Sequence, residues 1–355
     1  MNPPRDRLHV VVVSPPWYPV PPEGYGGVEM VVHLLVRELR GMGHHVTLVG
    51  AEGSAHDAVP QAPAAWRADL GTAPGPYREA TYAARVADLL AGAGDVDVVH
   101  DHVGTATLIA AALSSSAPVV HTCHGPLDEP QRTFYASLRT RVGMVAISDS
   151  QRQHAPELPW IGTVPNAVDV DDLPSPQPNP ADPGYLLCLA RVTPDKGQHL
   201  AVDVARRAGL PLTLAGKVDN PPESQRYWRE QVAPAVDGER VRHVENVAGR
   251  EKLELLRGAT ALLAPIQWNE PFGLSAVEAM VCGTPAISMR RGAAVELIED
   301  GVTGFLVDDV EGMADAVRRC GEIDRVRCAA VARERFRPQA MARGYVEVYR
   351  RALRR

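Results

Sequence analysis

The sequence has few cysteines, and their spacing matches neither a metal site nor a disulfide framework. The five cysteines are an odd number and contain no C-x-x-C pair: Cys123, Cys188, Cys282, Cys320 and Cys328. This pattern argues against a zinc ribbon and against a small fold held by disulfides. It predicts a reducing, cytoplasmic compartment.

Long apolar runs and a basic excess are also lacking. The apolar run at residues 10–13 is too short for a signal-peptide core, and no stretch approaches the ~20 apolar residues of a membrane helix. Peripheral membrane contact stays open. The formal net charge is -6, whereas a general nucleic-acid binder normally carries a basic excess, so no nucleic-acid partner is expected.

What the sequence does contain is a repeated strand–helix alternation over 355 residues, a length that predicts two domains. Short β-branched or apolar runs predict buried parallel strands, beginning with residues 9–13. In the first half we expect strands at 9–13, 46–49, 96–100, 118–121 and 143–147, and helices at 28–42, 78–90 and 105–113. Residues 51–78 are rich in Gly, Pro and Ala and predict a long loop.

A proline-rich segment separates this array from a second one. Residues 173–184 read LPSPQPNPADPG, which predicts a stiff linker and a domain boundary between 176 and 177. The second array predicts strands at 185–190, 212–215, 241–244, 261–264 and 285–288. The expected helices are 198–208, 251–257, 274–281, 310–320, 325–336 and an Arg-rich one near 339–353.

Two successive arrays of this kind predict an α/β fold of two facing, doubly wound Rossmann-like domains with a cleft between them. In such sheets ligands lie beyond the carboxyl ends of the strands. Residues that follow strands are therefore the candidates for a site. A nicotinamide fingerprint is absent, because the glycines near the first helix do not form G-x-G-x-x-G.

The segment 269–279, NEPFGLSAVEA, follows one predicted strand and opens a helix at Gly273. The free N–H groups and positive dipole end of a helix attract an anion. Glu270 lies just before this helix and Glu278 lies in its second turn, where both can accept hydrogen bonds from sugar or ribose hydroxyls. The alternative is a solvated helix start with acidic dipole partners.

Arg191 and Lys196 follow the strand expected at 185–190. Two cations on one loop suit a diphosphate, since Arg offers a fork of donors and Lys a point charge. Taken alone, a surface Arg and Lys beside a helix would be the commoner explanation.

Glycines and a histidine mark the first array in the same way. Gly26 and Gly27 precede the first helix, where glycine lets backbone N–H groups approach a phosphate or sugar closely. A flexible turn is the alternative. His124 follows the strand at 118–121 and can hydrogen-bond a reacting sugar.

Metal binding is not predicted. His100, His102 and His121 cluster in sequence near His124 but lack a firm ligand spacing. For His100 and His121 a hydrogen-bonded histidine at a strand end is favoured. Strand or helix capping explains the two Asp-x-Asp runs, 95–97 and 169–171, better than a metal does.

The motif at 269–279, followed by Gly283-Thr284-Pro285, resembles the retaining nucleotide-sugar glycosyltransferases of family four, whose fold is called GT-B. The resemblance runs almost end to end, and the order and spacing of its motifs make it specific. Further matching segments are 26–29, 98–102, 121–125, 164–169, 191–197, 215–216 and 301–307. The run Pro-Glu-Gly-Tyr-Gly-Gly-Val-Glu is similar to the subgroup containing an orthosomycin (avilamycin) antibiotic glycosyltransferase. The family usually has Gly where Ala167 stands, and Lys217 replaces a commoner small-residue pattern, so the role of Lys217 stays open.

The resemblance implies a function and assigns roles to residues. It implies transfer of a sugar from a nucleoside-diphosphate sugar to an acceptor hydroxyl, with retention and without a metal or other cofactor. Domain 1–176, with the last helix at 338–355 crossing back, would bind mainly the acceptor, and domain 177–337 the donor. His124, Arg191, Lys196 and Glu270 are the catalytic candidates and Glu29 the acceptor-binding one. The donor-binding candidates are Gly27, Arg191, Lys196, Glu270, Phe272, Gly273, Leu274, Ser275 and Glu278.

Two other functions stay open from the sequence. A GT-B epimerase or phosphorylase would use the same fold, and a non-catalytic sugar-nucleotide-binding protein could have kept it. The sequence names neither the sugar nor the base. The acceptor, whether a small molecule, a glycan or a lipid, and the oligomeric state are equally unspecified.

Overall fold

The chain divides into two compact units in the computed structural model, which describes residues 7–24, 26–171, 173, 176, 184–245 and 247–355. Unit 1 comprises Met1–Val168 with Pro338–Arg355, and unit 2 comprises Asp169–Arg337. The predicted linker at 173–184, including the position just after residue 176, lies largely outside the described residues. Each unit is described by itself.

Unit 1 is built on a seven-stranded sheet in which every described pair is parallel. The strand order is β3-β2-β1-β4-β5-β6-β7. The strands are β1 (His9–Val13), β2 (His45–Ala51), β3 (Val59–Ala62), β4 (Val98–Asp101), β5 (Val119–Thr122), β6 (Val142–Ala146) and β7 (Trp160–Thr163).

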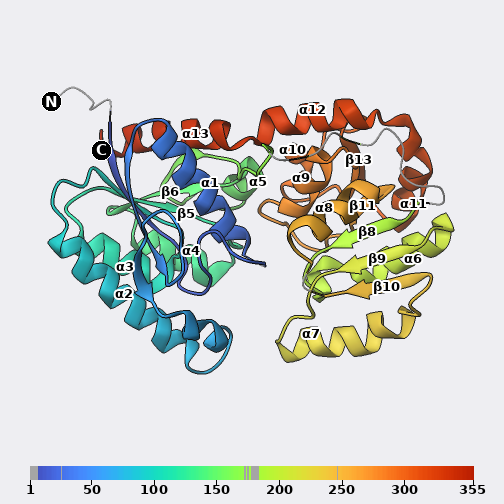
Figure 1. The fold of residues 1–355 in the computed structure, drawn as a ribbon, viewed down its shortest axis with the longest axis horizontal. Coiled ribbons are helices and arrows are strands. Elements are labelled where there is room, and N and C mark those ends of the chain that lie inside the picture. The colour runs from blue at the N-terminus through green and yellow to red at the C-terminus, as the bar shows by residue number, and fades with distance from the viewer. Residues whose placement is uncertain (1–6, 25, 172, 174–175, 177–183, 246) are drawn as a thin grey trace. The chain divides into compact units, whose positions relative to one another are not determined.

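Helices cover both faces of this sheet. They are α1 (Gly27–Gly41), α2 (Gly75–Gly92), α3 (Thr105–Ser114), α4 (Glu129–Ser137), α5 (Asp149–His154) and α13 (Pro338–Ala352). Helices α2 and α3 pack together on one side, and α1 and α13 pack together on the other (Figure 1). The C-terminal helix therefore completes the layer that begins with the first helix of the chain.

The strands form where the sequence can be buried on both faces. Val10–Val13 of β1 are almost fully buried, as a central parallel strand between two neighbours requires. In α1 the apolar residues recur at helical spacing, and Val31, Leu34, Leu35 and Leu39 are buried against the sheet. These two patterns place β1 inside the sheet and give α1 one apolar face buried in the core.

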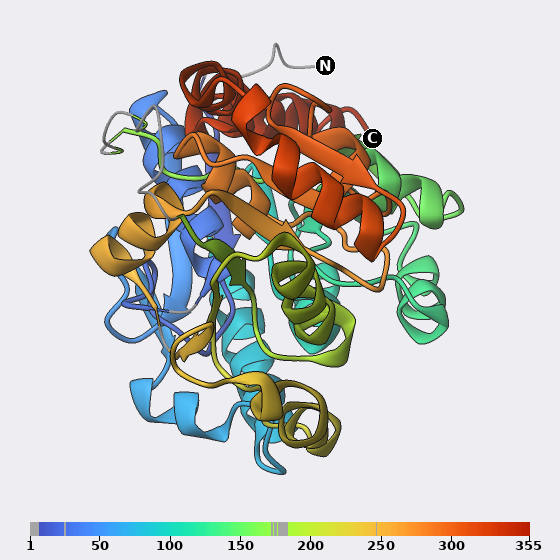
Figure 2. The ribbon, with the colours of Figure 1, turned by 90° about the vertical axis from the view of Figure 1, so that its right-hand side faces the viewer.

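Unit 2 is a six-stranded parallel sheet with the order β10-β9-β8-β11-β12-β13. Its strands are β8 (Leu186–Leu189), β9 (Leu212–Ala215), β10 (Val241–Val244), β11 (Ala261–Ala264), β12 (Ala286–Met289) and β13 (Gly304–Val307). Its helices are α6 (Gln198–Ala208), α7 (Pro222–Tyr227), α8 (Gly249–Gly258), α9 (Leu274–Val281), α10 (Ala294–Leu297), α11 (Val310–Arg319) and α12 (Arg325–Phe336). Helices α6 and α11 pack side by side (Figure 2).

Both sheets reverse their strand order at one point, which is where a doubly wound sheet opens a crevice. In unit 1 the reversal lies between β1 and β4, and in unit 2 between β8 and β11. The loops that follow these four strands are thus the positions at which each unit can bind a ligand.

The predicted fold class, α/β with two Rossmann-like doubly wound domains, is confirmed by these two sheets. The long loop predicted at 51–78 is wrong in part, because Val59–Ala62 adds β3 to the edge of the sheet. The edge position accounts for the miss: a strand paired on one side tolerates Pro60, which a sequence pattern assigns to a loop. Strands β7 and β13 were not predicted either.

Candidate active site

In unit 2, the loops after β8 and β11 are joined at the reversal point of the sheet. The Gln267 N–H donates to the Asp195 carbonyl at 2.7 Å. The Lys196 Nζ donates to Glu270 Oε1 at 2.5 Å and lies 5.5 Å from the centre of the Trp268 ring. Lys196 and Glu270, distant in sequence, therefore form one ion pair at the carboxyl ends of adjacent strands.

Gly197 makes this junction sterically available. Its φ is +70°, and a Cβ added there would lie 2.3 Å from the Pro265 carbonyl oxygen. A side chain at this position would force the two loops apart. The glycine next to Lys196 is thus required for the loop after β8 to reach the loop after β11.

Helix α9 begins four residues after Glu270, at Leu274. Gly273 precedes it with φ +110°, and Leu274 and Ser275 are half-buried in its first turn. The first N–H groups of a helix have no partner inside the helix and carry its positive dipole end. The Phe272 side chain is instead buried and packs edge-on against Phe336, with ring centres 6.2 Å apart. Only the backbone of Phe272 is therefore placed to contact a ligand.

Arg191 follows β8 and forms an ion pair with Asp219, from the loop after β9. Lys217 of the same loop lies 3.8 Å from Asp219 Oδ1. Glu278 accepts from Lys252 Nζ of α8 at 2.8 Å. Each acidic or basic candidate of unit 2 is thus engaged by an opposite charge, and the partners Asp219 and Lys252 were not predicted.

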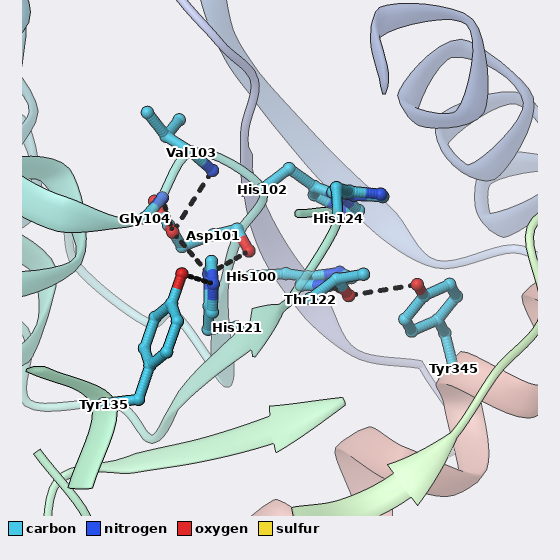
Figure 3. A network of polar contacts seen from close by, with 10 residues as sticks. All are labelled: His100, Asp101, His102, Val103, Gly104, His121, Thr122, His124, Tyr135 and Tyr345. Atoms are coloured by element: carbon cyan, nitrogen blue, oxygen red, sulfur yellow. Dashed lines mark hydrogen bonds and ion pairs between the residues drawn. The ribbon is translucent and has the colours of Figure 1, made fainter. Parts of the chain in front are cut away.

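His124 of unit 1 is held by a second histidine. Its Nε2 lies 2.9 Å from His102 Nδ1, and the two rings stack (Figure 3). Burial, together with the positive charge of His121, lowers the pKa of His124 to about 3. The His124 imidazole is therefore neutral at physiological pH, and among the described residues its Nε2 is the nitrogen in contact with another side chain.

The neighbouring histidines are tied to the protein. Burial alone would lower the pKa of His121, but its 2.8 Å contact with Asp101 Oδ1 raises that pKa to about 9. Asp101 Oδ1 also accepts from the N–H of Gly104 at 2.7 Å. His100 lies 2.7 Å from Tyr349 and 2.8 Å from Thr122. His100 and His121 are thus hydrogen-bonded core histidines, the reading favoured from the sequence.

Two features bear on a metal site. Within the described residues, no group of three or more His, Cys, Asp or Glu side chains is arranged to hold an ion. Asp97, from the first Asp-x-Asp run, accepts from the His9 N–H at 2.8 Å and so binds the backbone of a neighbouring strand.

Gly26 and Glu29 lie together at the start of α1. Gly26 has φ +157°, and a Cβ there would lie 2.7 Å from Pro22 and 3.1 Å from Glu29 Oε2. Glu29 is 5% exposed, and burial raises its pKa to about 7. Gly27 is half-buried as the first residue of the helix. A carboxyl group that is partly protonated at neutral pH can donate as well as accept a hydrogen bond.

Strand-end reasoning located most of these positions but not their partners. Lys217 and His102 were named from the sequence without these contacts, whereas Asp219, which follows β9, was missed although the same rule could have found it. Asp101 and Tyr135 could not be found that way, because their significance depends on contacts with His121.

The comparisons with known proteins agree for both halves. Residues 25–172 match Glycosyltransferase Family 4, and residues 169–335 match Glycosyl transferases group 1. The chain is 28% identical to a phosphatidyl-myo-inositol mannosyltransferase of Mycolicibacterium smegmatis, over 92% of this chain and 88% of that protein. It is 29% identical to a D-inositol 3-phosphate glycosyltransferase of Xylanimonas cellulosilytica, over 74% and 73%.

A solved structure is similar over the whole chain. AviGT4, a glycosyltransferase involved in Avilamycin A biosynthesis, is 27% identical with a TM-score of 0.72, and 98% of each chain is covered. Across the described residues, none of the helices combines the length and apolarity needed to cross a membrane.

These matches favour sugar transfer over the epimerase, phosphorylase and non-catalytic alternatives. The chain is therefore a glycosyltransferase of the GT-B type, whose first part matches Glycosyltransferase Family 4 and whose second part matches Glycosyl transferases group 1.

Proposed function

We propose that this glycosyltransferase moves a sugar from a nucleoside-diphosphate sugar to an acceptor hydroxyl, with retention at the anomeric carbon and without a metal ion. One observation carries the proposal: Lys196 and Glu270 meet at the start of α9, where the strand order of unit 2 reverses. A cation, a carboxylate and a helix N-terminus at one point match the diphosphate and hydroxyl groups of such a donor.

The leaving group is a diphosphate, whose negative charge grows as the sugar departs. Arg191, Lys196 and the first N–H groups of α9, at Gly273, Leu274 and Ser275, would stabilise that charge. Fixed donors of this kind act more strongly on the transition state than on the bound donor, and that difference is what raises the rate.

The remaining donor contacts follow from the carboxylates and the neutral histidine. Glu270 would orient the sugar hydroxyls, and Glu278 would accept from the ribose hydroxyls. The backbone of Phe272 would line the same segment, and Gly27 would let a backbone N–H approach the donor. His124, uncharged because burial and His121 lower its pKa to about 3, would hydrogen-bond the transferred sugar.

The acceptor is expected to present a hydroxyl group to unit 1, with Glu29 in contact with it. Two relatives have an inositol compound in their names, which supports a polyhydroxylated acceptor. The similarity to AviGT4 supports the predicted likeness to the orthosomycin subgroup. As the anomeric C–O bond to the diphosphate breaks, the departing phosphate oxygen takes the acceptor proton. Attack on the same face then gives retention.

A panel of nucleotide sugars tests the proposal. A donor at 100 times its Kd should stabilise the folded protein by about 2.7 kcal/mol, visible as a raised Tm. With the donor known, NMR of the product should show the anomeric configuration of the donor, and EDTA should leave the rate unchanged. An inverted product would contradict retention, and a rate abolished by EDTA would contradict metal independence. If no nucleotide sugar stabilised the protein, the proposed donor would be wrong.

A further inference from the structure

The loop after β9 lies directly on the loop that carries Arg191. Gly216 has φ +139°, and a Cβ there would lie 2.2 Å from the Ala190 carbonyl oxygen. The Val192 N–H donates to the Lys217 carbonyl at 2.9 Å, so the pairing of β8 with β9 continues beyond both strands. This backbone contact brings Lys217, a residue without a role so far, to the side of Arg191.

The Asp219 carboxylate lies between these two cations. Arg191 Nη1 contacts Asp219 Oδ2, and Lys217 Nζ lies 3.8 Å from Asp219 Oδ1. The Asp219 side chain is 15% exposed. Its backbone carbonyl accepts from Gln225 Nε2 at 2.8 Å, which fixes the position of the loop. The guanidinium and the ammonium therefore converge on one anionic group.

A phosphate presents acceptor oxygens to a guanidinium as a carboxylate does, with more charge. A diphosphate bound to Arg191 would place its negative charge against the Asp219 carboxylate, and like charges at this distance disfavour each other. Donor and carboxylate consequently compete for the same cations. Lys217, 3.8 Å from the other oxygen of the same carboxylate, lies beside the position that either anion would occupy.

We propose that Lys217 and Arg191 form one cationic pair for the donor diphosphate, and that Asp219 is an internal anion which occupies this pair until the donor displaces it. The proposal deepens the donor site described above and rests on it. Lys217 becomes a third phosphate-binding cation beside Arg191 and Lys196. Asp219 thereby lowers the affinity for the donor, although it does not contact the donor once the donor is bound.

The experiment measures Kd by calorimetry for UDP, GDP and ADP and for the corresponding monophosphates, with wild type and four variants. Asp219→Asn removes the internal anion, and Asp203→Asn is its control, since Asp203 pairs with Arg207 on the exposed surface of α6. Lys217→Met removes the added cation, and Arg207→Met makes the same change of net charge. Thermal unfolding verifies that each variant is folded.

For the nucleoside diphosphate that wild type binds, Asp219→Asn should lower the Kd on the order of fivefold, the effect of about 1 kcal/mol. Lys217→Met should raise that Kd by a similar factor and change monophosphate binding less than about twofold. Both α6 controls should bind as wild type does. The selective effect on the diphosphate separates phosphate contact from a general loss of structure.

Three results would overturn the inference: a diphosphate Kd unchanged or raised in Asp219→Asn, a Kd unchanged in Lys217→Met, or equal weakening of diphosphate and monophosphate in Lys217→Met. In each of these the wild type still binds a nucleoside diphosphate, so the proposed function stands. Failure of the wild type to bind any of the three would contradict the proposed donor site itself, and the inference with it.

Discussion

Arg191 is the residue whose removal should affect the chemical step most directly. It follows β8 and forms an ion pair with Asp219. Arg191→Ala should raise the free energy of the transition state by about 2 kcal/mol or more, because stabilisation of the leaving diphosphate increases in the transition state. This corresponds to a kcat/KM about thirtyfold lower. Steady-state kinetics at subsaturating donor measure this. Arg207→Ala, on the exposed face of α6, should remain within twofold (roughly) of wild type, and wild-type turnover in Arg191→Ala would contradict the assignment.

His121 should make the stability of the protein depend on pH above neutrality. Despite burial, its contact with Asp101 raises its pKa to about 9, from 6.5. The folded state thus holds this proton more tightly than the unfolded state does. The stabilisation is complete below pH 6.5 and is lost as pH rises to about 9. Burial raises the pKa of Glu29 to about 7. The loss of folding stability that this carboxyl group causes as pH rises is therefore nearly complete before pH 7.5.

Chemical unfolding between pH 7.5 and 9.5 measures the His121 contribution. The His121 contribution to the free energy of unfolding of wild type should fall by about 1–3 kcal/mol over this range, the scale of a buried hydrogen bond to a charged group. The double variant Asp101→Asn/His121→Gln keeps a neutral polar pair and should decline less than wild type by this amount, because the loss from the buried thiols, whose pKa burial also raises, is common to both. A decline of equal size in the double variant would show that other groups cause it.

The position of these candidate residues near strand ends was predictable from the sequence, but their pairing was not. Residues that follow strands gather at one sheet edge, so Lys196, Glu270 and His124 could be placed near strand ends without a structure. Their partners depend on the distance between loops. Lys196 meets Glu270 because Gly197 allows contact with Pro265, and Arg191 meets Asp219 because Gly216 lies against Ala190.

Among the elements, the two ends of α6 offer a matched test of that loop contact. Gly197 precedes α6 with φ +70° and Gly209 follows it with φ +71°. A Cβ on Gly197 would lie 2.3 Å from the Pro265 oxygen, whereas nothing lies within 4 Å of a Cβ on Gly209. Both substitutions to Ala carry the cost of a left-handed backbone, about 1–2 kcal/mol, and only Gly197→Ala adds a steric clash.

Gly209→Ala should therefore lower the free energy of unfolding by about 1–2 kcal/mol and leave kcat/KM near wild type. Gly197→Ala should lose more stability than this and also activity, because separating the loops moves Lys196 away from Glu270. Urea unfolding and kinetics on both variants provide the comparison. Equal losses of stability and activity in the two would mean that the contact with Pro265 does not set the site.

The strands that were missed share a physical reason. Most of the predicted strands were continuous apolar runs in the middle of a sheet, such as residues 9–13, where burial on both faces leaves a clear signal; the edge strand β10 was predicted as well. Strands β3, β7 and β13 lie at sheet edges, where burial is one-sided and the residue pattern is mixed. The sequence Val-Pro-Gln-Ala of β3 contains no periodicity from which an edge strand could be distinguished from a loop.

For the whole molecule, the C-terminal helix links the end of the chain to the histidine network of unit 1. Tyr345 and Tyr349 of α13 are fully buried. The Tyr345 hydroxyl lies 3.0 Å from Thr122, and the Tyr349 hydroxyl lies 2.7 Å from His100. Helix α13 also contacts α1 and β7. Unit 1 therefore consists of two segments that are far apart in the sequence, and the C-terminal segment contributes these two tyrosine side chains.

Ending the chain after Arg337 should consequently unfold or loosen unit 1 while unit 2, which is Asp169–Arg337, keeps its own core. Loss of two fully buried tyrosines alone corresponds to about 3–5 kcal/mol each on the scale of aromatic-to-alanine substitutions, close to the total stability of an ordinary domain.

Hydrogen exchange read by mass spectrometry should show lost protection in β1, β4 and β5, with β8, β9 and β11 unchanged. Ending the chain after Ala352 keeps α13 and is the control. Protection of β4 and β5 retained without α13 would mean that residues 7–168 are sufficient for unit 1, and the helix would then be an accessory to the fold rather than part of its core.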